Sequence, residues 1–192
     1  MLGVLVGLWT IALAPCSLSG ASVAASSVKQ YKAAEISFRY PSSWKISRFQ
    51  EESSFSTAMV FLSNEKLHPP CRTSQVPAGQ EITCGNPLQH LSKRGVLLEW
   101  AEVGTPTFSI DQTPGITGKI GGLVGRLEVT HPGTCSDVGA DETITAVADR
   151  APPADNNRYV LTACLRGPNL KSSTAMVAAL IRSTSFPGDT GS

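Results

Sequence analysis

Four cysteines constrain the fold of this chain more than any other feature of its sequence. Cys71, Cys84, Cys135 and Cys164 form an even set once Cys16, in the N-terminal leader, is set aside. Because an even set of cysteines in an exported chain is usually oxidised in pairs, we expect two disulfides and no free thiol nucleophile. Four cysteines allow three connectivities. Their positions favour Cys71–Cys84 together with Cys135–Cys164.

Each favoured pair has a physical rationale. Residues 72–83 are polar and have little apolar surface to hold a shape, so closing them with a disulfide would contribute about 3 kcal/mol in the chain-entropy model. Cys164 lies in a predicted strand and Cys135 follows another, so this pair would tie neighbouring strands, with about 3.5 kcal/mol from the longer loop. A metal site is the competing hypothesis. It is disfavoured because no CxxC or HxxxH spacing occurs and the additional ligand, His131, precedes a Pro-Gly turn.

The N-terminus predicts export. Residues 1–15 are apolar and uncharged, and a run of small and polar residues follows, which is typical of a secretory signal peptide spanning 1–25. Cleavage after the small residues 23–25 is favoured. Two alternatives stay open: lipidation of Cys16, whose preceding sequence LAPC resembles a lipobox with proline before the cysteine, and an uncleaved anchor. We therefore expect the protein to be secreted or held at the outer face of the cytoplasmic membrane, with membrane contact only through such a lipid or anchor.

Length and charge predict a single domain that does not bind nucleic acid. A chain of 192 residues with 41% hydrophobic content accommodates a single core. The 16 basic and 15 acidic residues leave a formal net charge of +1, so the chain lacks the basic stripe that phosphate neutralisation requires. We expect a linker at 26–32, one disulfide-stapled domain at 33–186 and a disordered tail at 187–192.

Hydrophobic periodicity predicts a β-rich domain. Ile36, Phe38 and Tyr40 alternate with polar residues and share one face of the first strand. Continuous apolar runs at 56–63 and 95–103 are typical of central strands that are covered on both faces. Further strands are expected at 118–122, 123–129, 143–149 and 158–165. The last two should form a hairpin.

Two helices are expected beside these strands. The longer one covers 169–186 and should pack on the sheet. Its periodicity gathers four residues on one face: Met176, Ala179, Leu180 and Ser183. A shorter helix should begin with Asn86 as its cap and stop at Gly95. The predicted fold class is α+β, an antiparallel sheet of about six or seven strands with a C-terminal helix and one short helix packed on it. Residues 104–117 have no period and should form a long connection.

Several short segments resemble one known family. ISFRYPSSW at 36–44, KIGGLVGRLEV at 119–129 and the helix end at 183–186 resemble the PsbP-like superfamily. More narrowly, segments such as CGNPL, GVLLEW and ACLRGP resemble secreted actinobacterial proteins of unknown function. The resemblance spans about residues 33–186. It implies an antiparallel sheet flanked by helices and an accessory or assembly role, and it implies no reaction. The chain differs from the family in lacking a long helix between its third and fourth strands.

The Pro-Ser-Ser-Trp sequence inside that motif predicts a structural corner. Pro41 ends the first strand because proline cannot donate a ladder hydrogen bond. Trp44 is expected to fold back over the strand end and bury its ring. We therefore interpret Pro41 and Trp44 as part of the scaffold.

Motifs for catalysis, cofactors and metals are weak. The sequence has no GxSxG elbow, and the glycines of 118–125 lie inside strand-like sequence, without the following Lys-Ser or Lys-Thr of a phosphate-binding loop. Three histidines are expected at exposed positions in loops or in the short helix: His68, His90 and His131. Three carboxylates cluster near Cys135 without the spacing of a calcium loop: Asp137, Asp141 and Glu142. We predict no catalytic, cofactor-binding or metal-binding residue.

Two function hypotheses follow. The favoured one is a non-catalytic secreted or envelope-attached binding or accessory module, whose ligand is an envelope protein, a lipid or a small apolar molecule. Arg166 is its candidate partner contact because a Gly-Pro break follows it, although capping of carboxylates or carbonyls is the commoner role of such an arginine. The alternative is an extracellular hydrolase whose site is assembled from residues that are distant in sequence. Its candidates are Glu99, Asp111, His131 and Asp137.

Overall fold

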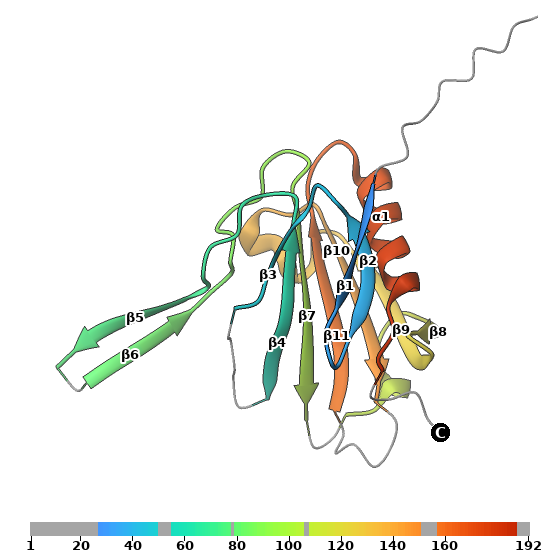
Figure 1. Ribbon diagram of the computed structural model, residues 1–192, viewed down its shortest axis with the longest axis horizontal. Coiled ribbons are helices and arrows are strands. Elements are labelled where there is room, and N and C mark those ends of the chain that lie inside the picture. The colour runs from blue at the N-terminus through green and yellow to red at the C-terminus, as the bar shows by residue number, and fades with distance from the viewer. Residues whose placement is uncertain (1–26, 50–54, 78, 106–107, 151–156, 188–192) are drawn as a thin grey trace, which may run out of the picture.

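The computed structural model describes residues 27–49, 55–77, 79–105, 108–150 and 157–187, and its centre is a seven-stranded antiparallel sheet (Figure 1). Its strands, in spatial order, are β3 (Lys45–Ser47), β4 (Ser56–Ser63), β7 (Val96–Gly104), β11 (Asn157–Leu165), β10 (Glu142–Asp149), β9 (Leu123–Thr130) and β8 (Ile116–Ile120). One helix, α1 (Leu170–Ser183), packs on this sheet. The α+β fold class predicted from the sequence is confirmed.

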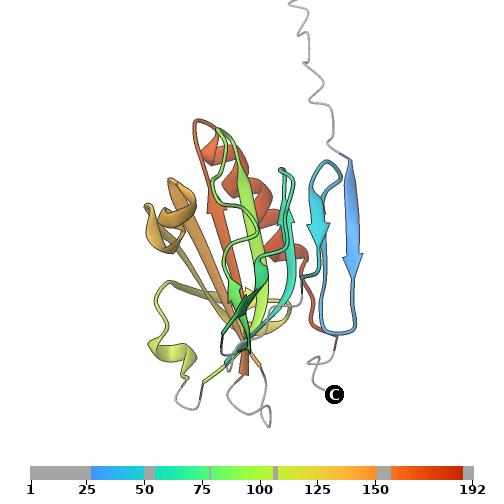
Figure 2. The same ribbon diagram turned by 90° about the vertical axis from the view of Figure 1, so that its left-hand side faces the viewer.

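A separate two-stranded sheet covers the same face as α1 (Figure 2). It pairs β1 (Val28–Lys32) with β2 (Ser37–Pro41) in antiparallel register. The interpretation of 26–32 as a linker is therefore wrong for β1. The reason is that β2 offers an open edge, which β1 satisfies, and Tyr31 stacks on Phe38 with ring centroids 5.0 Å apart.

The predicted corner joins the small sheet to the large one. β2 ends at Pro41, and the backbone N–H of Trp44 donates to the Pro41 carbonyl at 3.0 Å. Trp44 is only 5% exposed and lies in the main hydrophobic core, together with the predicted inward residues Ile36, Phe38 and Tyr40. β3 starts directly after it and pairs with β4. The corner therefore turns the chain from one layer to the next.

The C-terminal segment closes this core. Phe186, which follows α1, stacks on Tyr159 at 4.1 Å between centroids and meets Trp100 edge to face at 5.7 Å. Ser185 and Ser37 exchange backbone hydrogen bonds of 2.8 and 2.9 Å, which ties the end of the domain to β2. The sequence prediction of the helix face is only partly correct. Leu180 is buried as expected, but the buried stripe is Ser173, Val177, Leu180 and Ile181, so Met176, Ala179 and Ser183 lie at its margin or outside it.

The opposite face of the sheet is covered by loops and a 3₁₀ helix, η2 (Gly133–Val138). A second hydrophobic cluster lies there, and it includes Leu88 and Leu91. The short helix predicted to begin at Asn86 does not form. The backbone N–H of Leu91 donates to the Val138 carbonyl at 2.9 Å, so a donor that a helix would use internally is used by tertiary contacts.

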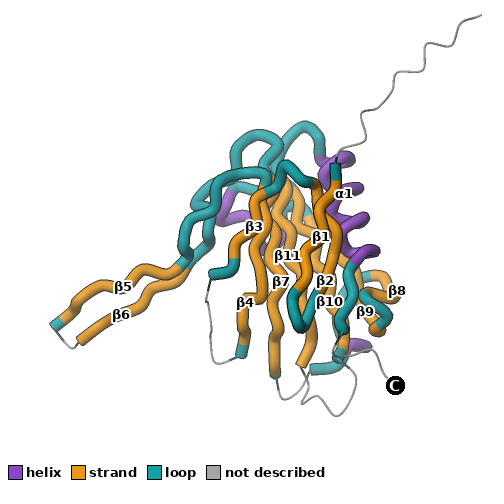
Figure 3. The backbone as a smooth tube through the Cα atoms, viewed as in Figure 1, coloured by secondary structure: helices purple, strands orange, loops and turns teal. Residues whose placement is uncertain are grey.

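A long two-stranded arm projects from the body (Figure 3). It consists of β5 (Cys71–Val76) and β6 (Gly79–Cys84), which pair only with each other. The Cys71–Cys84 disulfide closes its root, and Cys135–Cys164 links η2 to β11, so both predicted pairings are present. Disulfides indicate an oxidising, extracytoplasmic environment.

Some sequence predictions fall outside the described residues. These are the leader 1–25 with Cys16, and the tail 187–192 apart from Pro187. Among the described residues, no helix is long and apolar enough to cross a membrane.

Candidate functional site

An open cleft of about 760 Å³ lies at the root of the β5–β6 arm. Three prolines and Leu88 supply rigid and apolar parts of its wall. Its polar lining residues are His68, Arg72, Thr83, Asn86, Gln89, His90 and Asp137. The cleft therefore offers both apolar and polar side chains to a ligand.

The frame is fixed because the chain is clamped on both sides of the arm. The N–H of His68 donates to the Pro87 carbonyl, and the N–H of Gly85 donates to the Pro70 carbonyl, each at 3.0 Å. With the Cys71–Cys84 disulfide, these two bonds hold the entering and leaving segments side by side. The arm can thus be exposed while the cleft beneath it keeps its shape.

Arg166, the candidate partner contact, turns inward to a structural position. Its Nη1 donates to the carbonyl of Leu91 at 2.5 Å and to Nε2 of His90. Since a guanidinium has only donors, Nε2 of His90 must accept, which places the ring proton on Nδ1. Arg166 therefore fastens the loop that carries His90, and the carbonyl-capping role is the one that the geometry supports.

Asp137 links the cleft to a smaller cavity of about 220 Å³. One of its carboxylate oxygens accepts from Asn86 Nδ2 at 2.7 Å, and the other accepts from the N–H of Val138 at 2.9 Å. Glu99 and Thr162 line the smaller cavity beside the Cys135–Cys164 disulfide. Of the four residues proposed for a dispersed hydrolase site, Glu99 and Asp137 are thus brought to one cavity.

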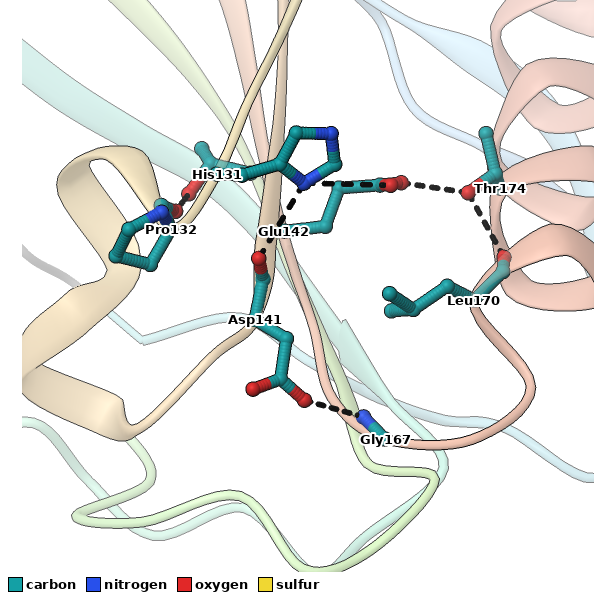
Figure 4. A network of polar contacts seen from close by, with 8 residues as sticks. His131, Pro132, Asp141, Glu142, Gly167, Leu170 and Thr174 are labelled. Carbon is teal, nitrogen blue, oxygen red and sulfur yellow. Dashed lines mark hydrogen bonds and ion pairs between the residues drawn. The ribbon is translucent and has the colours of Figure 1, made fainter.

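His131 lies at a different place, at the end of β9 (Figure 4). Its Nδ1 is 3.4 Å from the Asp141 carbonyl and 3.8 Å from a carboxylate oxygen of Glu142. The hydroxyl of Thr174, from α1, lies 2.6 Å from the other oxygen of Glu142 and 2.8 Å from the Leu170 carbonyl. The hydroxyl has one hydrogen, and donating it to Glu142 stabilises a carboxylate that is only 9% exposed. This network fastens α1 to the sheet.

The network gives a stability prediction. Replacing Thr174 with Val keeps the side-chain shape and removes the donor to Glu142, so the free energy of unfolding should fall by about 1–3 kcal/mol. Urea denaturation followed by circular dichroism measures the change. Thr174→Ser is the matched control, because it retains the hydroxyl and should remain within about 1 kcal/mol of the parent. Equal losses for both variants would contradict a role for the hydroxyl.

Asp111 lies near the opposite end of the sheet, in the 3₁₀ helix η1 (Ile110–Gln112). Arg126 holds this connection by donating to the carbonyls of Ile110, Asp111 and Gly115 at 3.2 to 3.4 Å. Burial, with a smaller effect of the Asp111 charge, raises the pKa of Asp149 above its ordinary value. The side chain of Asp111 is 93% exposed, and one of its carboxylate oxygens lies 3.9 Å from the Arg126 guanidinium, so it forms a solvent-exposed ion pair within this connection.

A second arginine helps to order the same connection. The guanidinium of Arg158 lies 4.2 Å from the centroid of the Phe108 ring, and its Nη1 donates to the Thr105 hydroxyl at 2.8 Å. Burial lowers the pKa of Arg158, but the group remains a cation at any physiological pH. The connection between β7 and β8 is thus held by two arginines, and it is shorter than the predicted 104–117 because β8 already begins at Ile116.

The three clustered carboxylates point to separate partners. Asp137 accepts from Asn86, Asp141 accepts from the N–H of Gly167 at 2.7 Å, and Glu142 faces Thr174. Across the part of the chain that the structure describes, no three His, Cys, Asp or Glu side chains are grouped to hold a metal ion. His68, His90 and His131 are exposed, as expected, although His90 lies in a loop.

Sequence reasoning missed the cleft. It singled out Asp137 and the disulfides, but it assigned no role to Arg72 or Gln89 and read Asn86 only as a helix cap, although all three line the cavity. The signal that was present is the clustering of prolines around Cys71 and Cys84, because prolines that flank a disulfide-closed segment fix the walls beside it.

No family model, curated protein or solved structure matches this chain. The resemblance to PsbP-like domains stays a prediction.

Proposed function

We propose that this chain is a non-catalytic, secreted or envelope-attached binding module that holds an extended segment of a partner protein in the cleft at the root of the β5–β6 arm. The main support for the proposal is that two polar groups lining the cleft, Asp137 and His90, already accept hydrogen bonds from the protein itself. Asp137 accepts hydrogen bonds from Asn86 and Val138, and His90 Nε2 accepts from Arg166. These contacts hold both side chains in the frame of the cleft, and Arg166 occupies the Nε2 lone pair that His90 would need to act as a general base.

The shape and lining of the site favour a polypeptide over a lipid. An acyl chain requires a mostly apolar cavity, but this cleft carries an arginine, two imidazoles and two side-chain amides beside its prolines. Each arm strand has one ladder edge that no other described strand occupies. An extended peptide can add to such an edge through its backbone and place alternate side chains in the neighbouring cleft.

The hydrolase alternative has less support. Glu99 and Asp137 share a cavity, but His131 and Asp111 lie with other partners, at the end of β9 and in η1. The proposed set of four therefore does not converge.

A cleft-filling substitution tests the proposal. No atom lies within 4 Å of the position that a Cβ on Gly85 would take, so Gly85→Trp places an indole in the cleft without a backbone clash. Short random peptides displayed on phage should yield binders, and their affinity, measured by fluorescence anisotropy, should fall at least about 10-fold in this variant because the indole occupies their space.

Ser172→Trp on the exposed side of α1 is the matched control and should bind as the parent does. Enriched peptides that bind Gly85→Trp as tightly as the parent would place binding elsewhere. A fluorescent fatty acid that binds, and is displaced by Gly85→Trp while no peptide binds, would identify a lipid site and overturn the polypeptide proposal.

A further inference from the structure

The last strand of the large sheet, β8, has an open outer edge. It pairs with β9 on one side, and in the described residues no strand lies on its other side. An unpaired edge is a template for another strand. Ile116 at its start is 78% exposed, and Val129 on the neighbouring strand is 44% exposed.

The turn between β8 and β9 fixes which backbone groups face outward. Gly121 and Gly122 have φ values of 60° and 90°, as in a type I′ turn, and Ile120 pairs with Leu123 across it. A pair next to such a turn is hydrogen-bonded, and bonded pairs alternate with non-bonded pairs along the ladder. The N–H and C=O groups of Thr117 and Lys119 therefore point away from β9.

We propose that β8 pairs with β8 of a second copy of this chain, antiparallel and with Gly118 on the two-fold axis, to form a symmetric dimer. In this register Thr117 of each copy exchanges N–H···O bonds with Lys119 of the other. Ile116 of one copy lies opposite Ile120 of the other, on the α1 side of the sheet. A two-fold contact of this kind uses the same patch on both copies and closes without further growth.

The residue types suit this register. Gly118 lies at the axis as a non-bonded pair, where Cα atoms approach to about 4.5 Å, and it brings no side chain to that point. Shifting the axis to Lys119 would set two lysines directly opposite each other, which is unfavourable. Shifting it to Thr117 would set Ile116 opposite Gly118 and leave the isoleucine uncovered. Of these three symmetric registers, the one centred on Gly118 is the one that both separates the lysines and places an apolar residue opposite Ile116.

A charge pair tests the register. In Thr117→Lys, each new lysine faces Lys119 of the other copy, so the dimer dissociation constant should rise about 10-fold at low salt because symmetry doubles the repulsion. Adding Lys119→Glu restores an opposite-charge pair and should return the constant to within about threefold of the parent. Sedimentation velocity over a concentration series measures all three proteins. Both side chains are exposed, so circular dichroism should show the same fold.

A cysteine at the axis gives an independent readout. The space around a Cβ on Gly118 is open, and a pair about 4.5 Å apart falls within disulfide range, so Gly118→Cys should form a covalent dimer under mild oxidation. Thr117→Cys, exposed on the opposite face and across from Lys119, should cross-link much more slowly. A monomer at every concentration, equal cross-linking of both cysteines, or loss of association that the double charge variant does not restore would overturn the proposal.

Discussion

Trp44→Ala is expected to lower the free energy of unfolding by about 3–5 kcal/mol, because it removes a buried aromatic ring and leaves a cavity. Trp44 is 5% exposed and belongs to the core formed by β2, α1 and the large sheet. It also lies where the chain passes from β2 to β3, and its backbone N–H donates to the Pro41 carbonyl. Its loss should therefore loosen the attachment of the small sheet as well as the core. Chemical denaturation measures the change.

Trp44→Phe is the matched control for this corner. It keeps an aromatic ring and the backbone bond, so it should cost clearly less than alanine. Peptide binding at the cleft should be unchanged in both variants at a temperature where they are folded, because Trp44 belongs to the core on the α1 side and the cleft lies on the opposite face. If Trp44→Ala unfolded like the parent but lost binding, the corner would be part of a site.

Most strands of the large sheet were predictable because their signals are local, whereas β1, β3 and the arm strands β5 and β6 were not predicted. The run 56–63 coincides with β4, and alternation placed Ile36, Phe38 and Tyr40 inward. The strand expected at 118–122 corresponds to β8, which begins earlier and ends before the two glycines, because these form the turn to β9. In each case the residues that decide the element lie within it or next to it, so period and turn chemistry suffice.

The failures occur where tertiary contacts decide. Asn86, Pro87 and the following leucines satisfy the local rules for a helix start, but Leu91 donates to Val138, and Ser92 donates to a carboxylate oxygen of Glu65 at 3.0 Å. These acceptors are distant in sequence, so no local pattern reveals them. The predicted buried face of α1 was also displaced from the observed one. Small residues such as Ala179 and Ser183 carry little information on burial, so the sequence pattern did not identify the face that packs on the sheet.

The candidate site was predictable only in part. The positions of the cysteines favoured the observed pairing among three possible ones, and the disulfides do border the cleft and the smaller cavity. The cleft itself arises from three segments that meet in space: the arm root, the loop after it and η2. Arg166 was recognised as a notable residue, but its partners His90 and Leu91 lie 76 and 75 residues away in the sequence, so its inward role could not be read from its neighbours.

Removing the Cys135–Cys164 disulfide, by replacing both cysteines with alanine, should lower the free energy of unfolding by about 3.5 kcal/mol. This bond joins η2 to β11 across 29 residues, and both cysteines are buried in the cluster that underlies the cleft. The crosslink is thus part of the cooperative unit, and its full effect on the unfolded chain should appear in global stability. Urea denaturation of the oxidised parent and the double variant measures it.

The variant with Cys71 and Cys84 both replaced by alanine is the comparison for this prediction, because it removes a disulfide that lies outside the buried cores. Chain entropy alone assigns that bond about 3 kcal/mol. The arm, however, pairs only with itself and the described side chains of its strands lie outside the buried cores, so it can open while the rest of the domain stays folded. Without the disulfide, the folded protein gains conformational entropy because its arm can open. The Cys71–Cys84 variant should therefore lose less global stability than the Cys135–Cys164 variant. Hydrogen exchange should instead show faster exchange confined to β5 and β6. Equal losses for the two variants would mean that the arm unfolds together with the sheet.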